Sequence, residues 1–361
     1  MQIPYLNRKH ILTGIVVFLM GFFVVFVSRY GRIHNPHAVH VDSTRTVYIW
    51  SKTDLTGLDE ASQLAGITYN KRRMHWVARM LGWVSFQPGR YEFDKSQSFP
   101  HFLRRFALGI QSPIRVTILP GQTEEGFARR VSSQFRFNGS RLWDLMHDTT
   151  ALANLGTNPT DLIGRMLPDT YQFYWTETPQ QVLQKILDVF QKKAVEPYQQ
   201  QYQKMGKSVN QILTIASIVE WEAGDNAEKP TIAGLYWNRL KKGWKLQADP
   251  TINYAKGVRS RLLFDDYYIK SPYNTYLHRG LPPGPITNPS LSSIRAALFP
   301  EKNDYMFMVA TPEGVHVFSK TFAQHKRRSA QWRRWLHKQY RLKREREEAR
   351  TDSLRKLQTA N

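Results

Sequence analysis

The stretch Ser208-Val-Asn-Gln-Ile-Leu-Thr-Ile-Ala-Ser-Ile-Val-Glu220-Trp-Glu222-Ala-Gly224 carries a strong structural pattern. Ser208 is a residue type that commonly caps the start of a helix. Apolar side chains then recur at helical spacing and form one stripe, at Ile212, Leu213, Ile215, Ala216, Ile218, Val219 and Ala223. The stretch therefore predicts a helix with one buried face, at the start of the last folded unit of the chain.

Two carboxylates lie at the margins of that buried face. At about 100° per residue, Glu220 and Glu222 fall on opposite sides of the stripe. A carboxyl group that is half-buried among apolar groups favours its protonated form, because burial disfavours the charge. A general acid needs this state near neutral pH. The same two residues also fit an ordinary helix surface, paired with Lys or Arg, and their spacing does not distinguish the two interpretations.

Length and composition limit the class of protein. The chain has 361 residues, enough for two or three compact units, and its 41% apolar residues exclude a wholly disordered protein. The 51 Lys and Arg outnumber the 29 Asp and Glu, giving a net charge of +22. Such a charge favours anionic partners, namely nucleic acid, a membrane surface or an anionic wall polymer. There is no cysteine, which excludes disulfide and thiolate chemistry.

The N-terminus contains a candidate membrane span. Residues 11–27 form a 17-residue run without charge, with Arg8 and Lys9 before it and Arg29 and Arg32 after it. A cleaved signal peptide is the alternative, but no Ala-x-Ala pattern follows the run. We expect residues 1–33 to form a cytoplasmic tail and a single-pass anchor, with the remaining chain on the extracytoplasmic, periplasmic face of the cell membrane. Cations flank both ends of the run, so they leave this orientation open.

The next segments predict a linker and a small α+β module. Residues 34–46 are polar and fit a linker. Strand, helix, strand, helix and strand patterns then alternate, at 47–50, 62–80, 89–93, 99–106 and 115–118. Gly66 weakens the first of these helices. The module therefore covers residues 47–120.

Residues 121–325 predict a larger α+β unit. Helical patterns dominate up to about residue 223, interrupted at Pro168, and two strands are expected at 305–310 and 315–319. The intervening segment is rich in Asn, Gln, Thr, Tyr and stiff Pro-Gly turns, which suit a sugar-binding surface. No His and carboxylate cluster indicates a metal site, and neither a Walker-type phosphate loop nor a Gly-x-Ser-x-Gly motif is present. We expect no metal and no cofactor.

The C-terminal residues 326–361 predict a basic helical tail. Between Lys326 and Arg346 there are ten Lys or Arg and one acid, interleaved with Trp332, Trp335 and Tyr340. A solvated helix that packs its Trp face on the preceding unit fits this pattern. A helix that binds anionic lipid or wall polymer also fits.

Six motifs, taken in order, closely resemble the YceG-like (MltG) endolytic murein transglycosylases. They are Leu213 to Gly224, Ile232 to Leu240, Leu246-Gln-Ala-Asp-Pro-Thr251, Tyr273-Asn-Thr-Tyr276, Gly280-Leu-Pro-Pro-Gly-Pro-Ile286 and His316-Val-Phe-Ser319. The resemblance extends to the segment at 167–171 and covers nearly the whole chain except the linker and the tail. It departs from the family at Pro120 and at Ile163, where acids are common, and at Trp221, which replaces a common Lys and adds a candidate stacking surface.

The resemblance implies a LysM-like module at 47–120 and a YceG-like catalytic domain at 121–325. It implies that Glu220, which closes the Ala-Ser-Ile-Val-Glu run, is the catalytic acid, and it leaves the role of Glu222 open. The implied reaction cleaves the glycosidic bond between N-acetylmuramate and N-acetylglucosamine, forms 1,6-anhydro ends and terminates nascent glycan strands. We expect Gln247, Asn274 and Tyr276 to position the substrate.

Three other functions fit parts of the pattern. The chain could be a non-catalytic peptidoglycan-binding membrane protein, a muramidase that uses water, or a nucleic-acid binder, the last being disfavoured because the anchor places the folded part where no nucleic acid is expected. The expected partners are peptidoglycan strands and the membrane, with peptidoglycan synthases as further candidates.

Overall fold

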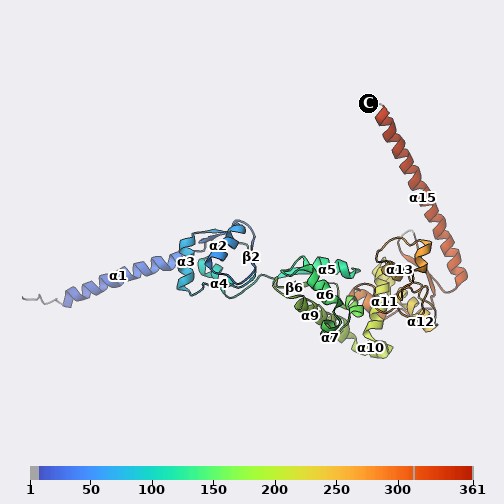
Figure 1. The fold of residues 1–361 in the computed structure, drawn as a ribbon, viewed down its shortest axis with the longest axis horizontal. Coiled ribbons are helices and arrows are strands. Elements are labelled where there is room, and N and C mark those ends of the chain that lie inside the picture. Colours follow the sequence, from blue (N-terminus) through green and yellow to red (C-terminus); the bar gives the residue numbers. More distant parts are fainter. Residues whose placement is uncertain (1–7, 312–313, 360–361) are drawn as a thin grey trace, which may run out of the picture. The chain divides into compact units, whose positions relative to one another are not determined.

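The computed structural model describes residues 8–311 and 314–359, which form two compact units (Figure 1). The first unit contains the described residues up to 116, together with 134–137 and 172–178. The second unit contains the rest of the described chain. The mixture of helices and short antiparallel strands agrees with the predicted α+β class.

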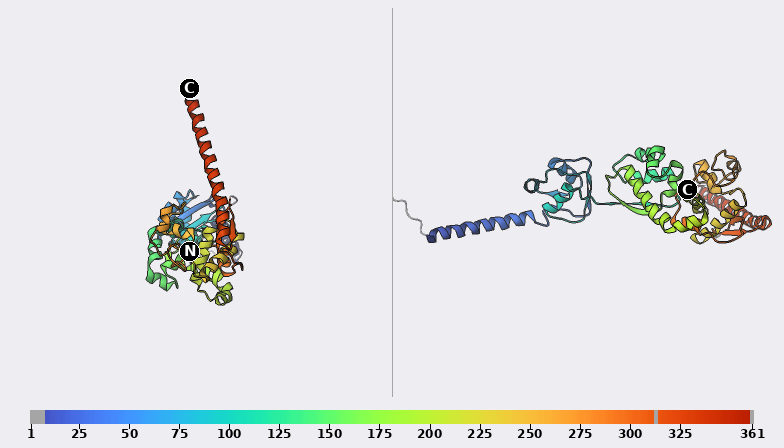
Figure 2. Two further views of the ribbon diagram at one scale, coloured as in Figure 1. Left: turned by 90° about the vertical axis from the view of Figure 1, so that its right-hand side faces the viewer. Right: turned by 90° about the horizontal axis from the view of Figure 1, so that it is seen from below.

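The first unit begins with one long helix, α1 (Arg8–Ile33), which Figure 2 shows without interruption. Residues Ile11–Ile33 are long and apolar enough to cross a membrane, and none of the most apolar 18 residues within this stretch is buried inside the protein. A signal sequence shares these properties. The helix runs six residues beyond the predicted end at residue 27 and includes Arg29 and Arg32. Ile33, its last residue, is buried in the core of the first unit.

A small module follows α1, built from two strand pairs and three helices. Strand β2 pairs with β4 in antiparallel register, with Val47 opposite Tyr91. An aromatic cluster that includes Phe93, Phe102 and Phe106 fills the core. The elements are β1 (Val39–His40), β2 (Arg45–Ile49), α2 (Leu55–Leu64), β3 (Thr68–Tyr69), α3 (Lys71–Met80), β4 (Gly89–Phe93), α4 (Phe99–Ala107) and β5 (Ile114–Ile118).

Part of the expected linker at 34–46 is folded into this module. Strand β1 pairs with β3, and the Val39 amide donates a hydrogen bond to the Gln97 carbonyl at 2.9 Å. The side chains of Val39 and Val41 are buried in the module core. Two alternating apolar residues in a polar segment gave too short a pattern to predict a strand.

The single helix expected at 62–80 is wrong, because the structure contains two helices there. Helix α2 ends at Leu64, strand β3 follows, and α3 begins at Lys71. Gly66 has a φ of +74°, a left-handed conformation that Gly adopts easily and that ends helices. Asn70 then caps α3 by accepting a hydrogen bond from the Arg73 amide at 3.1 Å.

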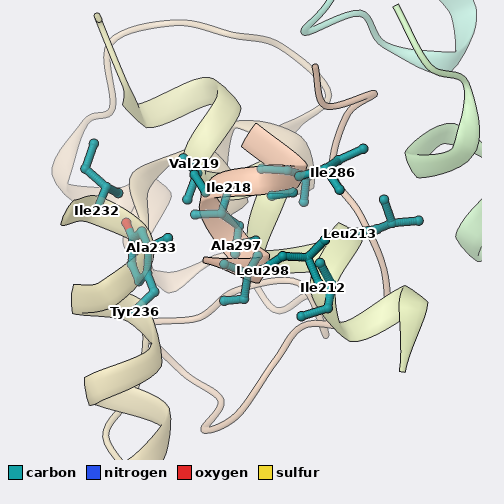
Figure 3. Packing of buried hydrophobic residues seen from close by; sticks show 14 of the residues in the cluster. Ile212, Leu213, Ile218, Val219, Ile232, Ala233, Tyr236, Ile286, Ala297 and Leu298 are labelled. Carbon is teal, nitrogen blue, oxygen red and sulfur yellow. The ribbon is translucent and has the colours of Figure 1, made fainter. Parts of the chain in front are cut away.

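The second unit is built around α11 (Val209–Glu222), which confirms the helix predicted from the opening stretch. Ser208 and Gln211 form a capping box at its start, with hydrogen bonds of 3.2 and 3.0 Å. Figure 3 shows side chains of α11 meeting those of α12 and α14 in one apolar cluster. This packing fixes the C-terminal end of α11 within the unit.

The remaining elements include two pairs of strands. Strand β6 pairs with β5, and β7 pairs with β8 in an antiparallel hairpin. The elements are α5 (Glu124–Ser132), α6 (Gly139–His147), α7 (Thr149–Asn154), α8 (Pro159–Arg165), β6 (Asp169–Phe173), α9 (Pro179–Phe190), the π-helix η1 (Gln191–Val195), the 3-10 helix η2 (Glu196–Tyr198), α10 (Gln199–Met205), the 3-10 helix η3 (Asn226–Glu228), α12 (Lys229–Lys241), α13 (Asp249–Lys256), the 3-10 helix η4 (Phe264–Tyr268), α14 (Leu291–Leu298), β7 (Phe307–Ala310), β8 (His316–Ser319) and α15 (Phe322–Thr359).

The basic C-terminal segment forms the long helix α15, which projects from the second unit in Figure 1. Its first turns pack on the β7–β8 hairpin, where the His325 ring stacks on Phe307 at 5.2 Å. Further along, the Tyr340 hydroxyl accepts a hydrogen bond from Arg261 at 2.9 Å. The rings of Trp332 and Trp335 stack on each other at 4.8 Å.

If β1 is part of the module, Val39→Ala should weaken it whereas His40→Ala should not. Val39 is fully buried, and losing its two methyl groups should cost roughly 1–3 kcal/mol of local stability. His40 is exposed on the same strand and serves as the matched control. Hydrogen exchange of the β1 and β3 amides in the full chain measures the effect. Equal protection in both variants would contradict a folded β1.

Candidate active site

The C-terminal turn of α11 carries Glu220 and Glu222 into two different environments. Glu220 meets the start of α14, whereas Glu222 meets α12 and is influenced by the charge of Asp249 at the start of α13. The two side chains are separated because residues two apart on a helix point in directions about 200° apart. The chemistry of each carboxyl group is therefore set by a different set of neighbours.

Glu220 is held by hydrogen bonds from the N-terminal end of α14. Its Oε2 atom accepts hydrogen bonds from the Ser290 amide at 2.9 Å, the Ser290 hydroxyl at 2.5 Å and the Ser293 hydroxyl at 2.6 Å. The buried Lys229 ammonium lies 3.3 Å from the same oxygen. All of these groups are donors, and the end of α14 also favours a negative charge.

These contacts favour the charged form of Glu220. Burial raises the pKa of this carboxyl group, but the hydrogen bonds from Ser290 and Ser293 and the charge of Lys229 outweigh it, so the pKa is lowered overall. A lowered pKa is the opposite of what a general acid needs near neutral pH. The surroundings of Glu220 therefore favour its anion, whereas the apolar stripe in the sequence favours the protonated form.

Glu222 has the property that was expected of Glu220. Its Oε1 atom accepts one hydrogen bond, from the buried Tyr236 hydroxyl at 2.6 Å. Burial raises the pKa of Glu222, and the negative charge of Asp249 raises it further, against the opposing effects of Tyr236, His316 and Arg239. The residue is only partly buried, so solvent still reaches part of it. The surroundings of Glu222 thus favour its protonated form, and solvent reaches part of the residue.

The neighbours of Glu222 are themselves fixed by hydrogen bonds. The pKa of Tyr236 is raised well above its ordinary value by burial and by Glu222, so its hydroxyl keeps its proton and remains a donor. Arg239 is buried, and its guanidinium donates to the Met306 carbonyl at 2.8 Å. His316, at the start of β8, lies 3.0 Å from Glu228 through Nδ1. The cluster around Glu222 is therefore rigid and mixed in charge.

Of the three expected substrate-positioning residues, Tyr276 lies close to this cluster. Its hydroxyl donates to Asp249 at 2.6 Å, and its ring contacts Tyr267 edge-on at 4.8 Å. Burial raises the pKa of Tyr276, and the charges of Asp249 and Glu222 add to this effect. The sequence analysis included Asp249 only as part of the motif Leu246 to Thr251, although its charge acts on both Tyr276 and Glu222.

Gln247 lies two residues before Asp249 and is exposed. Its φ of +50° makes it the one non-glycine residue with positive φ among the described residues. Such a conformation is costly, so the surrounding structure must enforce it. The Gln247 amide donates to the Thr275 carbonyl at 3.2 Å, which ties this turn to the segment carrying Tyr276. The side-chain amide of Gln247 is thereby presented to solvent next to Asp249.

Asn274 lies inside the loop that carries Tyr276. Its side chain is fully buried, and its amide donates to the carbonyls of Tyr267 and Ile269 at 3.0 and 2.9 Å. Its side-chain oxygen accepts a hydrogen bond from the Tyr276 amide at 2.9 Å. The side chain of Asn274 therefore holds the loop that presents Tyr276.

Trp221 is also placed differently from the expected stacking surface. The side chain is buried, and its Nε1 donates to the Gly121 carbonyl at 3.1 Å. The Arg259 guanidinium lies 5.4 Å from the ring centre. Trp221 therefore fastens α11 to the segment that follows β5 and leaves little ring surface free.

Buried amides also join distant segments behind the site. Asn288 is fully buried, and it accepts a hydrogen bond from the Gln122 amide at 2.7 Å and donates to the carbonyls of Leu119 and Met166 at 2.8 and 3.1 Å. In the preceding Pro-Gly loop, the Ile286 amide donates to the Ser217 hydroxyl at 3.0 Å. The motifs that are far apart in the sequence are thus packed around one helix, α11.

Fold and site together define a mixed α+β protein with two partly buried carboxyl groups, Glu220 and Glu222, at the end of one helix. A profile of the YceG-like family matches residues 47–331. The chain is 30% identical over 305 residues to the endolytic murein transglycosylase of Bacillus subtilis (strain 168), covering 80% of this chain and 85% of the relative. It is 27% identical over 319 residues to the endolytic murein transglycosylase of Streptococcus pneumoniae serotype 2 (strain D39 / NCTC 7466), covering 79% of this chain and 58% of that relative.

A solved structure is similar as well. The crystal structure of a YceG-like protein from Listeria monocytogenes matches with a TM-score of 0.57 at 28% identity, covering 80% of this chain and 99% of that one. The chain belongs to the YceG-like family. The family resemblance found in the sequence motifs is therefore confirmed.

The two carboxyl groups should change stability with pH in opposite directions. The raised pKa of Glu222 means that its contribution is present below its ordinary value of about 4.3 and is lost as pH rises through the raised value. The lowered pKa of Glu220 means that its contribution is present above about 4.3 and is lost as pH falls through the lowered value.

Glu222→Gln should therefore gain stability relative to the unaltered protein as pH rises above about 4.3 and through the raised pKa of Glu222. Glu220→Gln should lose relative stability as pH rises through the lowered pKa of Glu220 toward about 4.3, reaching a deficit of about 1–3 kcal/mol, because Lys229 is left without its anionic partner. Urea unfolding at a series of pH values measures both trends. Parallel pH dependences in the two variants would contradict the two assigned environments.

Proposed function

We propose that this protein is an endolytic lytic transglycosylase of peptidoglycan in which Glu222 is the general acid. The observation that carries the assignment is the position of Glu222 at the end of α11, where it is partly exposed and accepts a single hydrogen bond, from Tyr236 at 2.6 Å. The direction of its pKa shift agrees with this assignment. Membership of the YceG-like family supports the reaction class, since two relatives at 27–30% identity are named endolytic murein transglycosylases.

The choice between the two glutamates depends on their neighbours. Glu220 is the alternative, because the family motif in the sequence suggested it. Its carboxylate accepts four hydrogen bonds at one oxygen, including one from Lys229, and its pKa is lowered, so donating a proton would first require it to bind one at a cost. Glu222 accepts a single hydrogen bond, and both residues are partly exposed. In this proposal Glu220 is structural and joins α11 to α14.

The proposed reaction uses Glu222 twice. In its protonated form it donates the proton to the glycosidic oxygen between N-acetylmuramate and N-acetylglucosamine as the C1–O bond breaks. The resulting carboxylate then accepts the proton of the muramate 6-hydroxyl as that oxygen attacks C1. A 1,6-anhydro end forms, the second sugar leaves with a free hydroxyl, and Glu222 regains its proton. One carboxyl group is sufficient because the nucleophile is already part of the substrate.

The residues around Glu222 support this cycle. The Tyr236 hydroxyl, which keeps its proton, stabilises the carboxylate in the interval between the two proton transfers. We infer that Gln247 and Tyr276 position the sugars, since Gln247 is exposed and the Tyr276 ring lies beside Tyr267. Aromatic rings and neutral amides are suited to the apolar faces and hydroxyl groups of a glycan. Asn274 contributes indirectly, through the loop that it holds.

We propose that α1 is an uncleaved membrane anchor, with the folded units on the extracytoplasmic side. A signal peptide would be removed, whereas Ile33 at the end of α1 is buried in the core of the first unit. Removal of α1 through this residue would therefore leave a gap in a folded core. Anchoring would keep the enzyme beside newly made glycan, where it would terminate strands, and where peptidoglycan synthases are candidate partners.

The module at 47–120 is proposed to be a LysM-like glycan-binding unit. Strands β2 and β4 pair with each other, and the chain between them forms α2, the two-residue strand β3 and α3. A hollow of about 400 Å³ opens between β2 and α2, lined in part by Tyr48, Trp50 and Glu60. Exposed aromatic rings and a carboxylate in a hollow are the kind of groups that bind sugars.

The assignment of the acid is tested by comparing Glu222→Gln with Glu220→Gln on unmodified peptidoglycan. Glu222→Gln should fold normally and lose at least about 100-fold in turnover, because glutamine cannot donate the proton. Glu220→Gln should be less stable but retain measurable turnover when kept folded at low temperature. Release of anhydro-muropeptides, normalised to the folded fraction, is the measurement. Loss of turnover in Glu220→Gln, with turnover retained in Glu222→Gln, would instead assign the general acid to Glu220.

The pH dependence of the reaction gives an independent test. Activity requires protonated Glu222, so kcat/KM should fall as pH rises through its raised pKa, above the ordinary value of about 4.3. Mass spectrometry of the products separates the reaction classes, because an anhydro product is lighter by one water than a hydrolysed one. Hydrolysed ends would indicate a muramidase, and binding to sacculi without new ends would indicate a non-catalytic protein.

A further inference from the structure

Three arginines and a tryptophan surround a hollow at the end of α1. The hollow has a volume of about 210 Å³ and lies between the end of α1, α3 and the start of α4. Arg29 and Arg32 come from α1, and Arg73 and Trp76 come from α3. Its floor is apolar and is formed by Ile33, Val77 and Phe99, which belong to the core of the module.

On each of the two helices, the side chains that line the hollow are three residues apart in the sequence. Residues three apart on a helix share a face, so Arg29 and Arg32 project from one side of α1. Arg73 and Trp76 share a face of α3 in the same way. The burial of Ile33 in the module core fixes the end of α1 against that module, and the Arg29 guanidinium lies 6.0 Å from the Trp76 ring centre. The residues that form the hollow are therefore held in place by the packing of the first unit.

The positive charges at this hollow have no anionic partner in the protein. Across the described ranges 8–311 and 314–359, the side chains of Arg29, Arg32 and Arg73 make no ion pair and no hydrogen bond, and all three residues are exposed. By contrast, Arg45 and Arg90 in the same unit are paired with Asp42 and Glu92. Three unpaired guanidinium groups around one concavity favour a multivalent oxygen anion.

The position of the hollow along α1 indicates the source of that anion. The uncharged run ends at residue 27, so Arg29 and Arg32 follow by two and five residues. At about 1.5 Å per residue, this places them roughly 3–8 Å beyond the apolar segment. That is the depth of the headgroup phosphates, where Trp and Arg side chains are commonly found. This step depends on α1 being the membrane anchor proposed above.

We propose that the hollow formed by Arg29, Arg32, Arg73 and Trp76 binds the phosphate of one anionic phospholipid in the leaflet adjoining the module. The guanidinium groups bind the phosphate oxygens, and Trp76 packs against the glycerol part of the headgroup. About 210 Å³ holds a phosphate and glycerol but not acyl chains, which remain in the bilayer. A bound headgroup would fix the tilt of the module at the membrane surface.

The test uses the full-length protein in nanodiscs that contain mainly phosphatidylcholine with added phosphatidylglycerol. Native mass spectrometry should detect one phosphatidylglycerol retained per chain. Arg32→Gln/Arg73→Gln should lower the apparent affinity for this lipid by about tenfold or more, because two charge-assisted contacts to the phosphate are lost. The single substitution Arg29→Gln, on the exposed face of α1, should also weaken phosphatidylglycerol retention. It tests the third arginine of the hollow separately from the other two.

Arg72→Gln/Arg79→Gln is the matched control, since it removes two exposed arginines from the same helix α3 outside the hollow. Retention should then stay within about twofold of the unaltered protein. Equal losses in both double variants would overturn the site in favour of general surface charge. Retention of phosphatidylcholine at the same level would also overturn it.

Inorganic phosphate distinguishes a lipid from a soluble anion as the occupant. Excess phosphate should leave the lipid adduct in place, and complete displacement by phosphate would overturn the lipid assignment. Glycan cleavage is measured in parallel on the same samples. Loss of lipid retention with cleavage preserved supports a separate lipid site, whereas failure of the Glu222 test leaves the lipid measurement unaffected, so the two proposals fail independently.

Discussion

Helix α11 is surrounded by apolar side chains along most of its length, and the two carboxyl groups at its end must each be satisfied inside the fold. The protein meets this constraint in two ways. Hydroxyl and amide donors and a lysine favour the charged form of Glu220, whereas burial and a nearby negative charge favour the neutral form of Glu222. Helix α14 contributes to the first environment and α13 to the second, and α12 contributes to both, through Lys229 and Tyr236.

Much of the architecture could be predicted from local patterns. The cap at Ser208, the apolar stripe of α11, the strands at 89–93 and 115–118 and the break at Pro168 all depend on neighbouring residues, and each has a counterpart in the structure. The helix expected at 62–80 and the linker expected at 34–46 failed for a common reason. In both segments a two-residue strand, β1 or β3, forms through pairing with the other. Such short strands carry no local periodicity.

The candidate site was predictable only in part. Periodicity placed Glu220 and Glu222 at the margins of a buried face, and that is where they lie. Their protonation depends on Ser290, Ser293 and Asp249, which are 27 to 73 residues away in the sequence. No helical spacing encodes contacts over such separations. Asn274 was an equally reasonable sugar ligand from its residue type, and only its full burial and three internal hydrogen bonds revealed its role in the loop.

The burial of Ile33 has a mechanical consequence for a chain anchored through α1. Because the last residue of this helix is part of the module core, there is no free joint between the bilayer and the module. The module can then move only as the helix tilts or turns about its axis. Adding one residue between 28 and 32 would turn the module by about 100° about that axis and raise it by about 1.5 Å. The length of α1 thus sets both the height and the facing direction of the first folded unit above the lipid.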